Sequence, residues 1–146
     1  MNPTDTTAPS QTESIAFELD LPHPPEKVWR ALTDPALLAE WLLPVIAFKL
    51  EPGAAFTFKT QRYLGWDGVV NCQMLEFEPQ RKLRYTWTVP FLDTVVTFTL
   101  KPSATGTGLV IVQSGFKTEQ KREFGGARYG WNMMGGKLVE LLARIP

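Results

Sequence analysis

One stretch of the chain decides its fold: residues 21–42 read LPHPPEKVWRALTDPALLAEWL. Prolines cannot continue a strand ladder but fit the first turn of a helix. The negative charge of Glu26 suits a first helical turn, because it interacts favourably with the positive end of the helix dipole. The chain therefore turns from strand to helix near Pro24. Asp34-Pro35 then interrupts the apolar spacing, which predicts two short helices joined at that dipeptide, the second carrying Trp41.

Alternating apolar residues on either side of this stretch predict about seven strands. They cover residues 14–21, 46–50, 56–59, 69–77, 83–88, 95–100 and 109–113. In the longest, Val70, Cys72 and Met74 are expected to face inward, and a bulge near Leu75 would explain the apolar pair at positions 74 and 75. The residues GWDG at 65–68 predict a hairpin turn before it.

Residues 127–144 predict an amphipathic helix, because Trp131, Leu138 and Leu142 recur at helical spacing. An antiparallel sheet with a large apolar face needs cover, and this helix is the longest element available. We therefore expect an α+β helix-grip fold, a curved antiparallel sheet of six to seven strands wrapped around the C-terminal helix. Glycines at 130, 135 and 136 each cost about 1 kcal/mol relative to alanine, so they either let the sheet approach or leave a cavity.

The bulk composition fits one neutral domain of 146 residues. We expect residues 1–12 to form a disordered tail and residues 13–146 to form the domain. Fifteen acidic and fifteen basic residues exclude a field that gathers nucleic acid or anionic lipid. No apolar run reaches the ~20 residues of a membrane span, and the single cysteine fits a reducing compartment. The expected location is the cytoplasm.

The order of these pieces resembles the helix-grip fold of the START-like superfamily, and within it the family related to the activator of the Hsp90 ATPase. The likeness covers about residues 14–143. Its motifs are Pro25-x-x-Val28-Trp29-x-Ala31-Leu32-Thr33-Asp34-Pro35 with Trp41 after it, Pro52-Gly53 before a Phe-x-Phe strand, Pro79-x-x-x-Leu83-x-Tyr85-x-Trp87, Gly106-Thr107-x-Leu109, Ser114-Gly115-Phe116 and Gly130-Trp131.

The resemblance implies a hydrophobic cavity between the sheet and the last helix. Members of the superfamily bind lipids, hormones or polyketides, and a minority are cyclases or dehydratases. The Hsp90 co-chaperone itself has an additional N-terminal domain for which 146 residues leave no room, so we do not expect its activity here.

Most aromatic residues are predicted to point into that one space. The candidate ligand-binding residues are Trp29, Trp41, Phe48, Phe56, Phe58, Met74, Trp87, Phe98, Phe116, Trp131 and Met134. Aromatic stripes of this kind usually just fill a core. If they leave a cavity, it would suit a hydrophobic or aromatic small molecule, with the methionines as adaptable wall.

Groups suited to catalysis are sparse, and we predict no catalytic residue, metal site or cofactor. His23, the only histidine, lies among prolines at a helix entrance, and Cys72 is expected to be a small core residue. The leading hypothesis is thus a non-enzymatic binding domain for a hydrophobic small molecule. The alternative is a cyclase, dehydratase or hydrolase acting on a polyketide-like or aromatic substrate, with Gln73, Asn71 and Arg30 as its polar groups.

A third hypothesis is a protein-interaction or co-chaperone-like domain, related to the Hsp90 ATPase activator, with a second copy of itself or another protein as the possible partner. It predicts an exposed apolar patch formed by Trp66 and the loop at 114–124, which contains Phe116. The same two segments are the candidate gates of a cavity.

Overall fold

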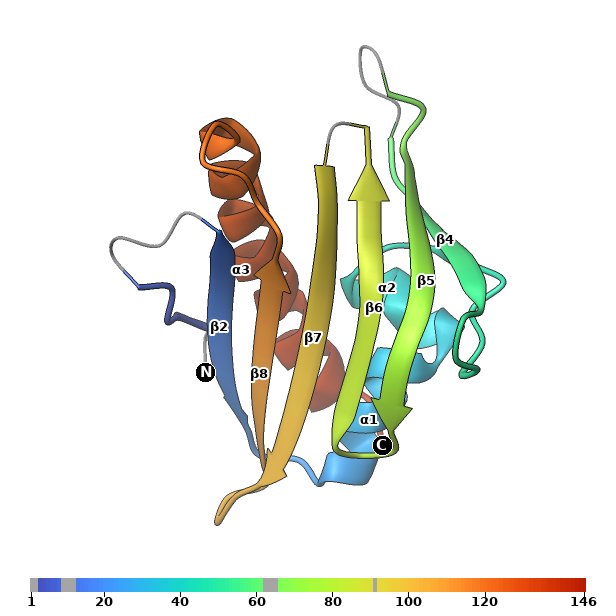
Figure 1. Cartoon of the computed structure of the whole chain (residues 1–146). Helices are drawn as coiled ribbons and strands as arrows, with labels where there is room; N and C mark the ends of the chain where they lie inside the picture. The colour runs from blue at the N-terminus through green and yellow to red at the C-terminus, as the bar shows by residue number, and fades with distance from the viewer. Residues whose placement is uncertain (1–2, 9–12, 62–65, 91) are drawn as a thin grey trace.

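A single antiparallel sheet and one long helix make up most of the molecule (Figure 1). The computed structural model describes residues 3–8, 13–61, 66–90 and 92–146. Its elements are β1 (Thr4–Asp5), β2 (Ser14–Leu21), α1 (Pro25–Thr33), α2 (Pro35–Trp41), β3 (Val45–Ile46), β4 (Ala55–Lys59), β5 (Val69–Glu78), β6 (Lys82–Val89), β7 (Leu92–Pro102), β8 (Thr107–Ser114) and α3 (Lys121–Arg144).

The sheet has the strand order β1-β2-β8-β7-β6-β5-β4-β3, and every neighbouring pair is antiparallel. The helix α3 runs along one face of this sheet, with α1 and α2 beside its C-terminal end (Figure 1). This is the helix-grip α+β fold that the sequence predicted. Of the eight strands in the described residues, the sequence did not predict β1, which is only two residues long.

The two short helices begin and end where the prolines and Asp34 predicted. Pro25 is the first residue of α1, and the backbone N–H of Asp34 donates to the carbonyl of Arg30 to end it. The Asp34 carboxylate then accepts from the N–H of Ala36 at 2.9 Å, so it also caps α2. The indole N–H of Trp41 donates to the carbonyl of Ala31 at 2.9 Å and holds α2 against α1.

The inward face of the long strand β5 is the predicted one. Val70, Cys72 and Met74 are buried, while Asn71 and Gln73 are exposed. The pairing of β5 with β6 shifts between Met74 and Glu76, which is the predicted bulge at Leu75. An extra residue there moves Leu75 to the outside, where 37% of it is exposed.

Three predicted boundaries differ from the structure. The predicted strand at 46–50 is paired with β4 only through Val45–Ile46, because Ala47 takes a positive φ of 62° and turns the chain out of the ladder. The last helix begins at Lys121 instead of residue 127. Within the predicted tail, Thr4–Asp5 pair with β2 as β1. Of the predicted hairpin turn at 65–68, residue 65 lies outside the described residues.

The glycines of α3 do not bring the sheet closer. A Cβ at Gly135 would lie 2.5 Å from the side chain of Pro3, so this glycine makes room for the N-terminal segment. A Cβ at Gly125, Gly126 or Gly136 would meet nothing within 4 Å. The Asp5 carboxylate also accepts from the Arg128 guanidinium at 2.6 Å, so the segment around β1 is tied to α3 at two points.

Candidate functional site

Eight aromatic side chains form a continuous cluster between the sheet, α2 and α3. Their ring centroids are 5.0 to 6.4 Å apart along the cluster. The members of this aromatic cluster are Trp41 from α2, Phe48 from the loop after β3, Phe56 and Phe58 from β4, Tyr85 and Trp87 from β6, Phe98 from β7 and Trp131 from α3.

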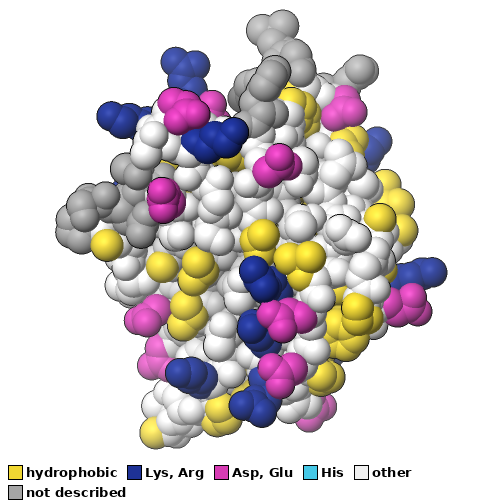
Figure 2. Space-filling view, in the orientation of Figure 1, with side chains coloured by type: hydrophobic (Ala, Val, Ile, Leu, Met, Phe, Trp, Pro, Cys, Tyr) yellow, Lys and Arg dark blue, Asp and Glu magenta, His cyan; other side chains and the backbone are white. Residues whose placement is uncertain are grey.

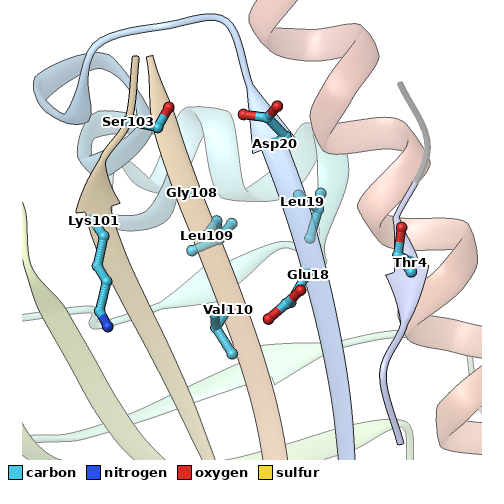
Figure 3. A pocket seen from close by; sticks show the side chains of 9 residues that line it. All are labelled: Thr4, Glu18, Leu19, Asp20, Lys101, Ser103, Gly108, Leu109 and Val110. Carbon is cyan, nitrogen blue, oxygen red and sulfur yellow. The ribbon is translucent and has the colours of Figure 1, made fainter. Parts of the chain in front are cut away.

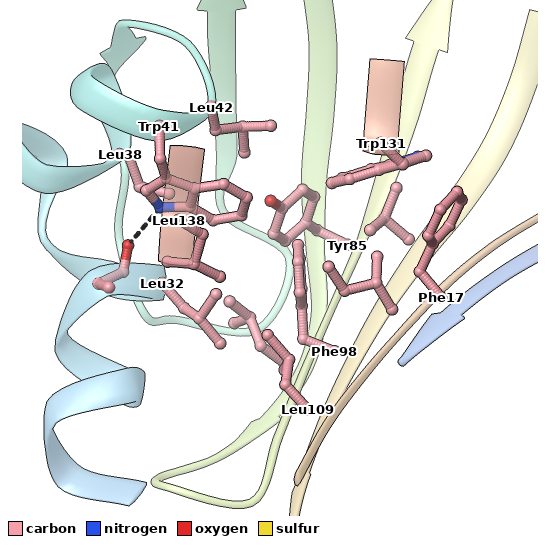
Figure 4. Packing of buried hydrophobic residues seen from close by; sticks show 14 of the residues in the cluster. Phe17, Leu32, Leu38, Trp41, Leu42, Tyr85, Phe98, Leu109, Trp131 and Leu138 are labelled. Atoms are coloured by element: carbon pink, nitrogen blue, oxygen red, sulfur yellow. Dashed lines mark hydrogen bonds between the residues drawn. The ribbon is translucent and has the colours of Figure 1, made fainter. Parts of the chain in front are cut away.

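Trp41 and Trp131 lie on either side of Phe98, whose ring centroid is 6.4 Å from the first and 6.0 Å from the second. Figure 4 shows these rings with Tyr85 in the layer between the sheet and the helices. Seven of the eleven predicted site residues are thus in the cluster. Tyr85, from the predicted strand at 83–88, completes the cluster but is not among the predicted site residues.

Four predicted site residues lie outside this ring network. Met74 is fully buried on β5. Phe116 packs edge-on against Phe124 near the N-terminus of α3, with centroids 5.3 Å apart, and both are buried. Trp29 and Met134 are half-buried at the margin of the core. The loop at 114–124 therefore presents no exposed apolar patch at Phe116, contrary to the third hypothesis.

The cluster is closed at one end and open at the other. Along β6, the inward residues Leu83 and Tyr85 are completely buried, whereas Trp87 and Val89 are only half-buried. On α3, Ala127 and Gly130 present little or no side chain, and a Cβ at Gly130 would meet only the end of Met134, at 3.7 Å. The partly exposed Trp87 and Val89 therefore mark the open end of the cluster.

A row of buried hydrogen bonds crosses the open half of the cluster. The indole N–H of Trp131 donates to Oε1 of Gln113 at 2.7 Å, and Nε2 of Gln113 donates to Oγ1 of Thr94 at 2.9 Å. The Thr94 hydroxyl donates in turn to the carbonyl of Trp87 at 2.8 Å. Gln113 and Thr94 are 2% and 3% exposed, so this row fixes Trp131 and Trp87 relative to three strands.

The hydroxyl of Tyr85 has no hydrogen-bond partner. It is the one fully buried side-chain N or O atom in that condition among the described residues. Figure 4 shows it directed toward the side of the cluster formed by Trp41 and Leu42. An unpaired buried hydroxyl costs about 1–3 kcal/mol, and native proteins contain few such groups. Burial, and then the neighbouring Cys72, raise the pKa of Tyr85 well above its usual range, so the hydroxyl stays protonated.

Cys72 and His23, the two side chains considered for catalysis, offer no reactive group to the cluster. Burial raises the pKa of Cys72 to about 12, so the thiol stays neutral, in agreement with a core role. His23 lies at the entrance of α1, where burial and then the charge of Lys27 lower its pKa. Among the described residues, no group of three His, Cys, Asp or Glu side chains is placed to hold a metal ion.

The polar groups named for the enzyme hypothesis face away from the cluster, and that part of the hypothesis is wrong. Asn71 and Gln73 are on the outward face of β5, and Gln73 Nε2 donates to the carbonyl of Gly53 at 3.4 Å. The exposed guanidinium of Arg30 donates to the carbonyl of Pro146. Because successive side chains of a strand point to opposite faces, Asn71 and Gln73 must face outward when Cys72 faces inward.

Two surface depressions lie away from the cluster. One, of about 530 Å³, is on the outer face of the sheet and is lined by charged, small and apolar residues, mostly of β2, β7 and β8, among them Glu18, Asp20, Lys101 and Gly108 (Figure 3). The other is beside the β5–β6 hairpin, around Pro79. The outer face as a whole mixes acidic, basic and scattered apolar side chains (Figure 2). In the part of the chain that is described, no helix is long and apolar enough to cross a membrane.

Known structures share this architecture. A Mesorhizobium loti protein, MLL2253, is 42% identical, covers 91% of this chain and 98% of its own, and has a TM-score of 0.84. CalU16 from Micromonospora echinospora is 22% identical over 97% of this chain and 84% of its own, with a TM-score of 0.75, which shows the fold alone.

DynU16, a protein of the dynemicin biosynthetic locus, has a TM-score of 0.78 at 23% identity, which again shows the fold alone. This chain aligns over 92% of its length with 48% of DynU16. No curated protein matches the chain. Residues 22–143 match the family described as activator of Hsp90 ATPase homolog 1-like protein, which is most of the chain. The chain therefore belongs to the activator of Hsp90 ATPase homolog 1-like family, within the START-like superfamily.

Proposed function

We propose that the protein binds a small, flat, largely apolar molecule that carries one hydrogen-bond acceptor, in the aromatic cluster between the sheet and α3. The observation that carries this proposal is the unpaired hydroxyl of Tyr85 inside a cluster of seven other aromatic side chains. Aromatic walls bind a flat guest through burial and ring contacts, and a single polar group fixes its orientation.

The open end at Trp87 supports a route into the cluster. Trp87 contacts both Phe58 and Trp131, at 5.3 and 6.0 Å between ring centroids, yet is itself half-buried. A guest that slides along Trp87 reaches the rings around Tyr85 next. The row of hydrogen bonds from Trp131 through Gln113 and Thr94 to the backbone carbonyl of Trp87 fixes the Trp131 indole beside the entrance, which supports a preorganised site.

The protonation state of the polar groups supports binding over acid–base catalysis. Tyr85 and Cys72 both have raised pKa values, and Gln113 and Thr94 do not ionise. Every polar side chain at the cluster is therefore neutral near pH 7, whereas a general acid or base works best with a pKa near the working pH. A neutral phenol is a hydrogen-bond donor, which suits a ketone, quinone or ether oxygen on the guest.

The family supports a hydrophobic guest, since START-like domains commonly hold one between the sheet and the last helix. DynU16, which shares this fold, belongs to a biosynthetic locus. A guest made by a biosynthetic pathway is consistent with that. We also place the protein in the cytoplasm, a proposal supported by a lone, buried cysteine.

Pairs of probes that differ only in an acceptor test the proposal. Suitable pairs are acetophenone with ethylbenzene, 2-acetylnaphthalene with 2-ethylnaphthalene, and 2-acetylanthracene with 2-ethylanthracene. Calorimetry should give saturable binding for at least one pair, with the ketone bound about 3- to 10-fold more tightly, since a net hydrogen bond contributes about 0.5–1.5 kcal/mol. The wild-type protein binding none of the six probes would sink the proposal.

The variant Tyr85→Phe tests the acceptor. It should bring the ketone and its alkyl partner to equal affinity by weakening the ketone alone. Tyr129→Phe is the matched control, because Tyr129 is 72% exposed on α3 and the same atom is removed there. Binding that keeps its preference for ketones in Tyr85→Phe would leave the aromatic site but exclude Tyr85 as the donor.

A further inference from the structure

The outer face of α3 carries six residues at alternating spacings of four and three: Arg122, Gly126, Tyr129, Met133, Gly136 and Glu140. This is the seven-residue repeat of a helix that pairs with another helix along one seam. The buried residues Phe124, Trp131 and Leu138 are about half a turn around the helix from these six, so this outer seam is on the side of α3 away from the sheet. Its members are exposed, except Gly136, which is half-exposed.

The outer seam contains features that the folded monomer does not use. Tyr129 and Met133 are 72% and 48% exposed, and they are two of the four exposed large hydrophobic residues in the described chain. A Cβ at Gly126 or Gly136 would meet nothing within 4 Å, so no contact in the monomer requires glycine there, although glycine weakens a helix. Neither Arg122 nor Glu140 is in an ion pair within the described residues.

The outer seam is complementary to itself when reversed. Each of three residue pairs is centred on position 131: Arg122 with Glu140, Gly126 with Gly136, and Tyr129 with Met133. A two-fold axis at that level, perpendicular to α3, would place every member opposite its counterpart on an antiparallel copy. Opposite charges then meet at both ends, small residues meet small residues so that the backbones approach closely, and each methionine sulfur meets a tyrosine ring.

We propose that the outer seam of α3 is a homodimer interface in which two copies of this chain pair antiparallel around a two-fold axis. The charge complementarity selects a second copy over an unrelated partner, because the same seam supplies both signs at matching ends. Arg122 and Glu140 are about 27 Å apart along the axis, so one helix face buries less than the ~800 Å² per partner of a standard interface. We therefore expect a weak dimer that depends on concentration and on salt.

Charge reversal tests the pairing. Sedimentation velocity from about 5 to 500 µM at low salt should show the wild-type protein shifting from monomer to dimer. Arg122→Glu and Glu140→Arg should each weaken the dimer at least about tenfold, because both end pairs become repulsive. A mixture of the two variants should form a heterodimer, since positions 122 and 140 are then both acidic in one chain and both basic in the other.

Lys121→Glu is the matched control, because it reverses a charge in the same helical turn but points about 100° away from Arg122. It should leave association unchanged. The proposal is overturned if the wild-type protein stays monomeric over the whole range, if Lys121→Glu weakens the dimer as much as Arg122→Glu, or if the mixture stays monomeric. Circular dichroism checks that each variant is folded, and these surface substitutions leave the core residues in place.

Discussion

The two faces of α3 differ in what their residues do for the folded chain. On the inner face, Phe124, Trp131 and Leu138 are buried, and Gly135 is in contact with Pro3. On the outer face, Tyr129 and Met133 are exposed, and Gly126 has open space around it. The fold requires the first set of residues. The second set is free to serve association, so glycine and aromatic residues have opposite consequences on the two faces of the same helix.

The largest expected difference is between Trp131→Ala and Tyr129→Ala. Removal of the Trp131 ring leaves a cavity beside Trp87 and Phe98 and takes the donor from Gln113, so it should cost about 3–5 kcal/mol of unfolding free energy. Tyr129→Ala should cost less than about 0.5 kcal/mol, because its side chain is exposed. Urea unfolding followed by circular dichroism measures both. Equal losses would mean that the inner and outer faces are not distinct.

The arrangement of the elements followed from local signals in the sequence. Pro25 begins α1, Asp34-Pro35 separates α1 from α2, and the parity of Cys72 sets the inward face of β5; each depends only on neighbours in the chain. The missed first turns of α3 depend on a side-chain contact with the loop before the helix. Two adjacent glycines at 125 and 126 favour a loop, but Phe124 packs on Phe116 and holds the helix there.

The candidate site was predictable only in outline. Alternation along β6 places Tyr85 and Trp87 on the inward face, as expected for a core or a cavity. That Tyr85 lacks a partner, and that Gln113 links Trp131 to Thr94, depends on how β7, β8 and α3 pack together, which alternation within one strand does not reveal. For the same reason the pairing of Thr4–Asp5 with β2 had no local signal, since it needs the free edge of β2 and the cation of Arg128.

A smaller effect should appear when the pH is raised, because the inner layer holds neutral groups that ionise in the unfolded chain. The thiol of Cys72 has a pKa of 9.0 without burial and about 12 in the folded chain. Between these values the unfolded state binds fewer protons than the native state, so stability is full below pH 9 and falls as the pH rises toward 12. At pH 10.5 the loss from this thiol should be about 2 kcal/mol.

Comparison of Cys72→Ala with the wild-type protein isolates this contribution. The variant is expected to be less stable at pH 8, because a buried side chain is truncated, but its stability should decline less between pH 8 and pH 10.5. Urea unfolding at the two pH values gives both numbers. An unchanged decline in the variant would assign the alkaline loss to other groups, with the buried hydroxyl of Tyr85 as the first to test.

The smallest predicted effect is a change in unfolding free energy that is favourable on the outer face of α3 and not on its inner face. Gly126→Ala should raise the unfolding free energy by about 0.5–1 kcal/mol, because alanine is the better helix former and its Cβ meets nothing. Gly135→Ala makes the same change nine residues further along, but its Cβ would lie 2.5 Å from Pro3 and must displace the segment that carries β1 and the Asp5–Arg128 ion pair. We expect no gain from Gly135→Ala, and a loss of hydrogen-exchange protection where β1 pairs with Phe17 and Glu18. A gain of equal size at both positions would show that Pro3 moves aside freely, and that the N-terminal segment contributes little to holding α3 on the sheet.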